Sequence, residues 1–412
     1  MSEIRNISLA GAGRQKIAWV RSYMPVLSGL ESRFERDKPF LGRKIAVSIH
    51  LEAKTANLAI ALRAGGAEVF ITGSNPLSTQ DEIAAALAEM GFEVFAYHGA
   101  TDAEYRDHLV KTLACRPDII IDDGGDFVEL LHGECACFAV NVTGGCEETT
   151  TGLSRLRARE REGKLRFPMI AVNDAESKCL FDNHHGTGQS VWDAIMHSTN
   201  NMISGKTVVV AGFGHCGSGI AERASGLGAN VIVTEINPVR ALEAAMRGFR
   251  VMKMDDACAL GEIFVCATGC NKVITARHFE KMRDGVLLSN AGHFDVEVDK
   301  PSLEACSVSN EVRKPGIRGY RTSDGRWLNL LGEGRLVNLA AGNGHPAEIM
   351  DMSFAVQALC ALEICLRGKD MAPGVHNVPA EVDGLVSRLK AEAMGLGIDE
   401  LSEEQKLYIN SY

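Results

Sequence analysis

Basic residues, long hydrophobic runs and a leader pattern are all scarce in this sequence. Lys and Arg number 43 against 53 Asp and Glu, so the formal net charge is −10 at pH 7. This charge disfavours binding to nucleic acid or to anionic membranes. The first residues, MSEIRNISLAGAGRQ, lack the basic and then apolar pattern of a signal peptide, and no uninterrupted apolar run reaches the roughly 18 residues of a membrane span. We therefore expect a cytoplasmic protein that binds neither nucleic acid nor membranes.

Paired cysteine motifs are missing as well. The 12 cysteines include no CxxC pair and show no regular spacing, which is typical of reduced, buried thiols in a cytosolic enzyme. Cys135 with Cys137 and Cys266 with Cys270 come closest to a metal-ligand pattern, but no second ligand pair follows at zinc-finger spacing. We therefore predict no bound metal.

Apolar β-rich runs alternate with amphipathic helical stretches over residues 44–173. The runs are KIAVSIH, AEVFITGS, FEVFAYHG and DIIIDDGG. Alternation at this spacing predicts a parallel sheet with helices on both faces. Ligands bind beyond the carboxyl ends of such strands. The residues at these ends are polar: His50, Ser74, Asn75, Asp122, Asp123, Asp126, Glu147, Glu148, Asn173 and Asp174.

A glycine-rich turn between two apolar runs follows at residues 206–235. The first run leads into GFGHCG, a helix of small residues comes next, and the second run ends at Glu235. This pattern is typical of a dinucleotide site, in which the three glycines allow a tight turn, a close approach to the pyrophosphate and close helix–strand packing: Gly212, Gly214 and Gly217. An acid at Glu235 would bind the ribose hydroxyls and repel a 2′-phosphate, so we predict NAD, although Arg240 could serve a 2′-phosphate. The alternative is a glycine-rich turn in another kind of α/β protein.

The strand pattern continues to residue 343 and predicts a second α/β domain. The long apolar helix that follows, SFAVQALCALEICLRG, needs a partner surface, so we place it back on the first domain. We expect a hinge where the chain crosses near 183–190 and 344–350. The predicted fold is α/β, with two doubly wound, Rossmann-like parallel-sheet domains, a hinge and a C-terminal helical arm. The expected divisions are a substrate domain at 1–182 completed by 346–372, an NAD domain at 183–345 and an oligomerisation tail at 373–412.

Lys178 and Asp182 lie four residues apart in ESKCLFDNHH and would share one face of a helix, next to Asn183. Such a pair is ordinarily a surface ion pair, but here it lies where the chain leaves the first domain and would face the interdomain cleft. A lysine in a partly closed cleft can lose its proton and act as a base near neutral pH.

Other candidates are acids and histidines at strand ends. Asp123 and Glu148 follow different strands, where acids can also cap helices or ligate Mg²⁺, and that alternative stays open. His50, His293 and His345 each end a strand or open a helix, which is uncommon for a core histidine, so we treat them as site residues.

Several segments resemble those of one family, the adenosylhomocysteinases. They are SNPLSTQDEIAAAL, DDGGD, EETTTG, VNDAESKCLFDN, VTEINP, SNAGHFDVEVD and GRLVNLAAGNGHP, in this order. The resemblance runs from Val26 to about Arg367 and is closest to the short microbial members. It implies reversible hydrolysis of S-adenosyl-L-homocysteine to adenosine and homocysteine, with one tightly bound NAD per subunit acting as a catalyst. In that family the 3′-hydroxyl is oxidised, the 4′ proton is removed, homocysteine leaves, water adds and the ketone is reduced again.

The resemblance also assigns roles to residues. Lys178 and Asp182 match residues that hold the ribose hydroxyls, with Lys178 assisting removal of the 3′-hydroxyl proton, and Asn183 matches a residue beside the ring. Asp123 matches an acid that moves protons, flanked by His50 and His293. Further substrate contacts are implied at Thr55, Glu148 and His345. Cofactor contacts are implied at Thr149, Thr150, Thr151, Asn183, Gly212, Gly214, His215, Cys216, Gly217, Glu235, Arg240, Asn290, Ala291, Gly292, His293, Asn338, His345 and Lys406.

The expected base contacts depart from the family pattern. Many members carry a threonine and a glutamate or glutamine where this chain has Glu52 and Lys54. Lysine only donates hydrogen bonds, whereas the adenine amino group needs an acceptor. Hypoxanthine would accept from Lys54, so S-inosyl-L-homocysteine is the alternative substrate. Because Glu52 can restore an acceptor, we keep adenosine first.

The C-terminal tail departs from the pattern too, since Lys406 is followed by Tyr408 and Tyr412 at unusual spacing. The resemblance implies a homotetramer in which this tail reaches the neighbour's NAD site. Two other classes remain as alternatives: an inactive NAD-binding regulator, which the intact site residues disfavour, and a conventional dehydrogenase.

Overall fold

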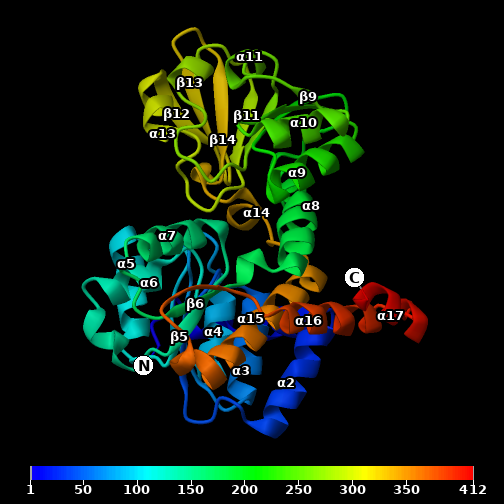
Figure 1. The fold of residues 1–412 in the computed structure, drawn as a ribbon. Helices are drawn as coiled ribbons and strands as arrows, with labels where there is room; N and C mark the ends of the chain where they lie inside the picture. The colour runs from blue at the N-terminus through cyan, green and yellow to red at the C-terminus, as the bar shows by residue number, and fades with distance from the viewer. Residues whose placement is uncertain (1, 412) are drawn as a thin grey trace.

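Two separate β-sheets organise the computed structural model, which describes residues 2–411 (Figure 1). The first sheet has the order β15-β6-β5-β4-β1-β2-β3, and its paired strands all run parallel. Its strands are β1 Lys44–Ser48, β2 Glu68–Thr72, β3 Glu93–Phe95, β4 Ile119–Asp122, β5 Gly144–Glu147, β6 Pro168–Ala171 and β15 Gly374–Asn377. The alternation predicted from the sequence is confirmed here.

The register of this sheet brings several strand ends to one edge. Ser48 pairs with both Thr72 and Asp122, and Asp122 pairs with Glu147. The residues just beyond these ends therefore come together. The helices of this lobe are α1 Ala10–Arg21, α2 Pro25–Asp37, α3 Ala53–Ala64, α4 Asp81–Glu89, α5 Asp102–Leu113, α6 Asp126–His132, α7 Thr150–Arg161, α15 Ala347–Arg367 and α16 Ala380–Ala393.

The second sheet has the order β12-β13-β14-β11-β10-β7-β8-β9. Its strands are β7 Thr207–Ala211, β8 Asn230–Thr234, β9 Arg250–Val251, β10 Ile263–Cys266, β11 Val286–Asn290, β12 Ser307–Lys314, β13 Ile317–Thr322 and β14 Trp327–Leu331. The helices around it are α8 Thr187–Thr199, α9 His215–Gly226, α10 Pro238–Met246, α11 Met254–Ala257, α12 Ala276–Phe279, α13 Lys300–Ala305 and α14 Val337–Ala340.

One edge of the second sheet differs from the purely parallel arrangement that we predicted. Strand β13 pairs antiparallel with both β12 and β14. Only Pro315 and Gly316 separate β12 from β13, and a two-residue turn can join antiparallel strands but not parallel ones. The remaining pairs, from β14 to β9, are parallel.

A single helix, residues 176–199, crosses from the first lobe to the second (Figure 1). It contains a π-helix at Lys178–Gly186 that continues without a break into α8. The indole of Trp192 donates to the Ile220 carbonyl of α9 at 2.9 Å, which fixes the far end of this connecting helix to the second lobe. Widened π turns occur often at functional sites.

The long apolar helix α15 lies in the core of the first lobe. By length and composition alone, the helical stretch Ala347–Asp370 could cross a membrane, but 67% of its most apolar window is buried inside the fold. Its apolar residues pack among those of α2, α3 and the first sheet. The expectation that this helix needs a partner surface is confirmed.

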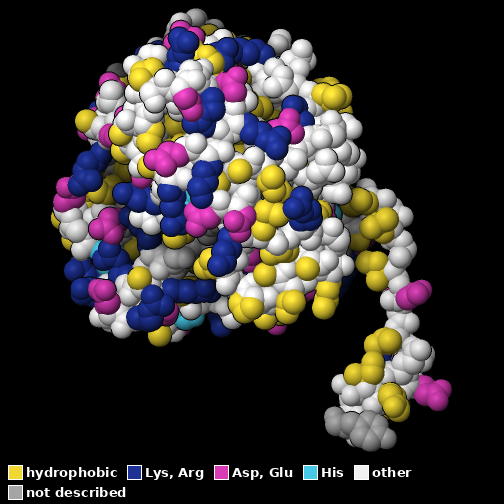
Figure 2. Space-filling model, turned by 90° about the horizontal axis from the view of Figure 1, so that it is seen from above, with side chains coloured by type: hydrophobic (Ala, Val, Ile, Leu, Met, Phe, Trp, Pro, Cys, Tyr) yellow, Lys and Arg dark blue, Asp and Glu magenta, His cyan; other side chains and the backbone are white. Residues whose placement is uncertain are grey.

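The segment 373–412 has two structurally different parts. Strand β15 pairs with β6 in the first sheet, and α16 packs against α15 and α2. Beyond α16 the chain extends away from the body to α17, Glu403–Asn410 (Figures 1 and 2). Apolar side chains on this arm, such as Leu407, are exposed. Tyr412 lies outside the described residues.

Candidate active site

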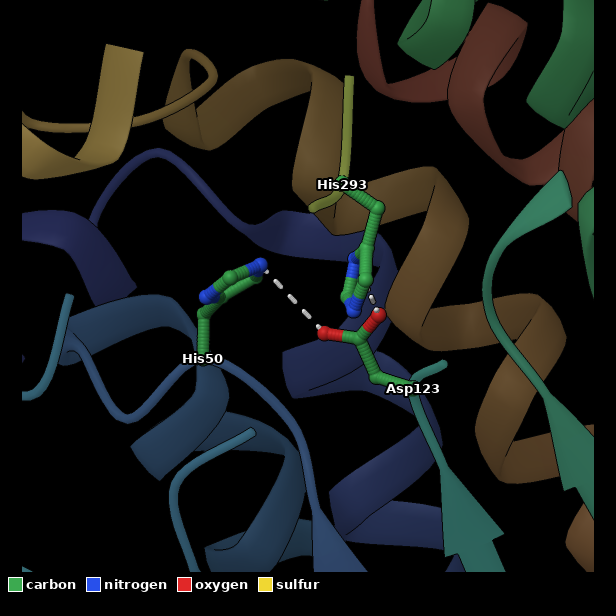
Figure 3. Close-up of side chains that lie close together, drawn as sticks. All are labelled: His50, Asp123 and His293. Atoms are coloured by element: carbon green, nitrogen blue, oxygen red, sulfur yellow. Dashed lines mark ion pairs between the residues drawn. The ribbon is translucent and has the colours of Figure 1, made fainter. Parts of the chain in front are cut away.

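Three predicted site residues meet where the two lobes face each other. Asp123 follows β4, His50 follows β1, and His293 comes from the loop after β11 of the other lobe (Figure 3). The Asp123 carboxylate lies 3.4 Å from His50 Nε2 and 3.5 Å from His293 Nδ1. A Cβ on Gly124 would lie 2.5 Å from His293 Nε2, so only glycine lets the histidine come this close.

Burial and hydrogen bonds set the charges of this group. Burial alone would raise the pKa of Asp123, but the two facing imidazoles and the Ser74 hydroxyl, which donates at 2.7 Å, lower it below its usual value. Burial lowers the pKa of His50 to about 4, so its ring is neutral at pH 7. A charged carboxylate and a neutral imidazole in contact are two groups between which a proton can move.

The same three side chains also form a possible metal ligand set. One ligand atom from each of His50, Asp123 and His293 lies within 4.8 Å of the others. Imidazole nitrogens and a carboxylate are ligands that Zn²⁺ and similar ions accept. From the sequence, metal ligands were conceivable only among cysteines and clustered acids, Asp123 included, and not among the histidines.

A second buried cluster surrounds the Lys178 ammonium. Its Nζ lies 3.1 Å from Asp182 Oδ1, 3.0 Å from Asn183 Oδ1 and 3.7 Å from Glu148 Oε1. The predicted Lys178–Asp182 contact is therefore present, and the pair is buried, unlike an ordinary surface ion pair. Burial raises the pKa of Glu148 to about 8, against the opposing effect of Lys178.

The predicted proton loss by Lys178 is wrong for this arrangement. Burial would lower its pKa, as we expected, but the charges of Asp182 and Glu148 outweigh burial and raise it above the ordinary value. Lys178 is thus a fixed cation here. A fixed cation stabilises a neighbouring oxyanion instead of acting as a neutral base.

Two residues that sequence reasoning missed complete this cluster from α15. Ser353 donates to Asp182 Oδ2 at 2.5 Å, and the Gln357 amide donates to Glu148 Oε2 at 2.5 Å. Both are polar residues within the apolar segment 352–362 of that helix, which was the one signal available. His345 also contacts Asp182, with its Nδ1 2.8 Å from Oδ1.

The glycine turn of the second lobe has the shape that a dinucleotide needs. A Cβ on Gly217 would lie 2.0 Å from the Gly212 carbonyl oxygen, so helix α9 can start this close to β7 only with glycine there. Glu235, just after β8, accepts the Phe213 N–H at 2.7 Å and the N–H groups of Ile236 and Asn237. These bonds hold its carboxylate beside the turn, where it fits NAD. The Arg240 guanidinium lies next to Gly214.

Other predicted cofactor residues are distributed around this turn and the lobe boundary. Asn338 donates to Ser190 at 3.0 Å, and its buried Oδ1 has no hydrogen-bond partner among residues 2–411, as expected of an atom that awaits a ligand. Asn290 bonds the backbone of residues 292 and 294 and so shapes the loop of Ala291, Gly292 and His293. Cys216 accepts from Thr187 near the start of α9, and His215 begins that helix.

The remaining four predicted cofactor contacts lie on two other helices, α7 and α17. Thr149 caps α7 and accepts from the Gly152 N–H, with Thr150 and Thr151 in the first turn of that helix. Lys406 is exposed on the C-terminal arm and pairs with Glu403 at 2.7 Å. Within one chain the structure does not bring Lys406 to the site.

A cavity of about 690 Å³ lies between α1, α3 and residues 343–348. Lys54 enters it with Nζ 2.8 Å from the Asn343 carbonyl oxygen and 3.0 Å from Glu52 Oε2. Gln80 also lines the cavity. Thr55 turns away and donates to the His50 carbonyl at 2.6 Å.

Two family models and several curated proteins match this chain. The model of S-adenosyl-L-homocysteine hydrolase matches residues 1–139, and that of its NAD binding domain matches residues 183–344. The S-inosyl-L-homocysteine hydrolase of Methanopyrus kandleri is 54% identical over 99% of this chain and 97% of its own length. The adenosylhomocysteinase of Pyrococcus abyssi is 53% identical over 99% of this chain and 97% of its own. Both names therefore occur at the same level of similarity.

Proposed function

The chain belongs to the S-adenosyl-L-homocysteine hydrolase family, whose members hydrolyse a thioether with the help of NAD, and we propose that its substrate is S-adenosyl-L-homocysteine. The products would be adenosine and L-homocysteine. The observation that carries this proposal is the buried contact of the Lys178 ammonium with Asp182, Asn183 and Glu148.

This cluster offers what two ribose hydroxyls require. The carboxylate of Asp182 and the carboxyl group of Glu148 can accept from the hydroxyls, and the ammonium of Lys178 donates to the oxygen that becomes negative. Bound NAD supplies the hydride acceptor for the 3′ carbon. Because Lys178 stays charged, it would lower the pKa of the 3′-hydroxyl rather than take its proton directly. The proton would pass to one of the two neighbouring carboxyl groups, Asp182 or Glu148, and return when the ketone is reduced.

Asp123 would carry the protons of the elimination. Its carboxylate would take the 4′ proton once the neighbouring carbon is a ketone, and a proton would return to the leaving sulfur, so no net proton is consumed. His50 and His293 contact this carboxylate from the two lobes. Since His293 comes from the second lobe, opening of the lobes would remove it from the proton-transfer group and closure would restore it.

The residues expected to contact the base favour adenine over hypoxanthine. Two partners, Asn343 and Glu52, already engage the Lys54 ammonium, and the Glu52 carboxylate and the Gln80 amide offer acceptors for an amino group. One observation favours a second candidate, S-inosyl-L-homocysteine. The ammonium has three donors, so one remains for the oxygen of hypoxanthine.

The NAD-loaded protein should be given homocysteine with either adenosine or inosine, and the thioether product should be followed by mass. A faster reaction with adenosine is expected. A faster reaction with inosine would assign the second candidate, and no product from either would overturn the proposed reaction.

We further propose that the enzyme is a cytoplasmic homo-oligomer. The family resemblance implies that it is a homotetramer. All 12 cysteines are free, which suits a reducing compartment. The exposed apolar side chains of the arm suit burial against another copy (Figure 2). Light scattering of the purified protein with and without residues 395–412 would test the assembly.

A further inference from the structure

The connecting helix that carries the Lys178 cluster is capped by a residue from the C-terminal segment. Like every helix, it leaves its first backbone N–H groups without partners inside the helix. The carboxylate of Asp383, on α16, accepts the N–H of Glu176 at 2.8 Å and that of Ser177 at 3.2 Å. The Ser177 hydroxyl donates to the other oxygen of the same carboxylate.

We infer that Asp383 is a positioning residue for the reaction, because it holds the start of this helix and thereby the place of Lys178. Lys178 follows Ser177 directly, so any loosening of the first turn moves Lys178 before it moves the rest of the helix. A carboxylate also suits the positive end of the helix dipole. The inference rests on the proposed function, in which the ammonium of Lys178 must meet a ribose oxygen.

The support behind Asp383 is itself fixed. Lys390 lies two turns along α16 and pairs with Asp351 at 2.9 Å, where both side chains are buried. Asp351 in turn accepts the N–H groups of Val26 and Leu27 at the start of α2. Helix α16 is thus held to the lobe at one end and to the connecting helix at the other.

The Lys390 contact provides a matched control for a purely structural role. Lys390→Met would loosen α16 on the lobe without touching Ser177 or any predicted site residue. Asp383→Ala would remove the cap, whereas Asp383→Asn would keep an acceptor oxygen, and asparagine caps helices well. Ser177→Ala removes only the hydroxyl contact and serves if Asp383→Ala does not fold.

The test follows the oxidation of bound adenosine as the rise of absorbance near 340 nm in the NAD-loaded enzyme, alongside the melting temperature and the kcat and KM of turnover. We expect Asp383→Ala to slow the absorbance rise and kcat by about 10- to 100-fold, since small misplacements of reacting groups have effects of this size. Asp383→Asn should stay within about threefold of the wild type, and Ser177→Ala should slow the rise by about threefold. Lys390→Met should lower the melting temperature but slow the oxidation much less than Asp383→Ala does, because the contacts of Asp383 with residues 176 and 177 remain.

Two results would overturn the inference alone: an Asp383→Ala enzyme that oxidises adenosine at the wild-type rate, or a Lys390→Met enzyme that slows as much as Asp383→Ala at an equal melting temperature. If Asp383→Ala does not fold, unchanged oxidation in Ser177→Ala would also overturn it. A wild-type enzyme that shows neither absorbance change nor turnover with either nucleoside would overturn the proposed function, and the inference with it.

Discussion

His345 contacts Asp182 at the place where the chain passes twice between the lobes, with Nδ1 and Oδ1 2.8 Å apart. Asp182 lies on the first passage and His345 on the second, so this contact ties the two passages together. Asp182 also accepts a hydrogen bond from the Ser353 hydroxyl and forms an ion pair with Lys178. Burial would raise its pKa, but Lys178, His345 and Ser353 together hold it well below the usual range. Asp182 is therefore a charged acceptor at any working pH.

Replacing His345 by alanine should leave the Asp182 carboxylate less firmly held in the orientation that accepts from the ribose. We expect kcat to fall about tenfold, because a hydrogen bond to a charged group contributes about 1.5–3 kcal/mol. Steady-state turnover measures the effect. His345 also contacts Thr187 at 3.2 Å, so Thr187→Val is the control: it removes this contact and the one from Thr187 to Cys216, but leaves His345 against Asp182. Equal losses in the two variants would show that the Asp182 contact is not what matters.

Replacing Lys178 by alanine should abolish both turnover and the absorbance rise near 340 nm with adenosine. The variant removes the cation that would stabilise the 3′ oxyanion, a loss worth at least about 10²-fold. Far-ultraviolet circular dichroism should show an unchanged fold. A variant that still oxidises adenosine at a normal rate would assign the 3′ chemistry to another group.

Replacing Asp123 by asparagine should separate the two halves of the reaction. Asparagine keeps the shape but cannot take up a proton, so we expect turnover to fall by about 10²–10⁴-fold. Oxidation of adenosine should persist, because the Lys178 cluster is intact. Parallel measurements of thioether cleavage and of absorbance near 340 nm test this pattern. Loss of both activities would mean that Asp123 acts before the elimination.

The contrast between these two clusters shows what the sequence could and could not predict. Strand periodicity and glycine turns placed Asp123, Glu148 and Glu235 at strand ends, because those signals are local. Spacing alone placed Lys178 beside Asp182. The antiparallel edge at β12 to β14 was not predicted, since short apolar runs do not reveal strand direction.

Long-range partners escaped prediction for a different reason. Ser353, Gln357 and Asp383 meet their partners across 171, 209 and 206 residues of sequence, and one sequence carries no signal for such distances. The prediction of the charge state of Lys178 failed for the same reason, because the pKa of Lys178 depends on Glu148, which follows a different strand. Composition and spacing therefore predict which residues form a site better than they predict how those residues are charged.

Replacing Lys54 by glutamate should shift base preference toward adenine. The ammonium would be lost from the cavity and an acceptor gained, so we expect the ratio of adenosine to inosine turnover to rise about tenfold, or about 1.4 kcal/mol. Synthesis-direction assays with both nucleosides measure the ratio. Gln15 of α1 lines the same cavity, so Gln15→Glu, which adds a carboxylate while keeping Lys54, is the control. An unchanged ratio in Lys54→Glu would remove Lys54 from base recognition.

The buried ring of His50 should make the fold less stable in acid. Burial lowers its pKa from 6.5 to about 4, so between these values the unfolded chain binds a proton that the folded chain does not. This contribution to stability is fully present above pH 6.5 and is lost as the pH falls to 4; it amounts to about 3 kcal/mol. We expect the melting temperature of the wild type to fall over this range, and that of His50→Gln to fall less. His197→Gln, which changes an exposed ring, should follow the wild type, and parallel curves for all three proteins would show that His50 is not the group that titrates.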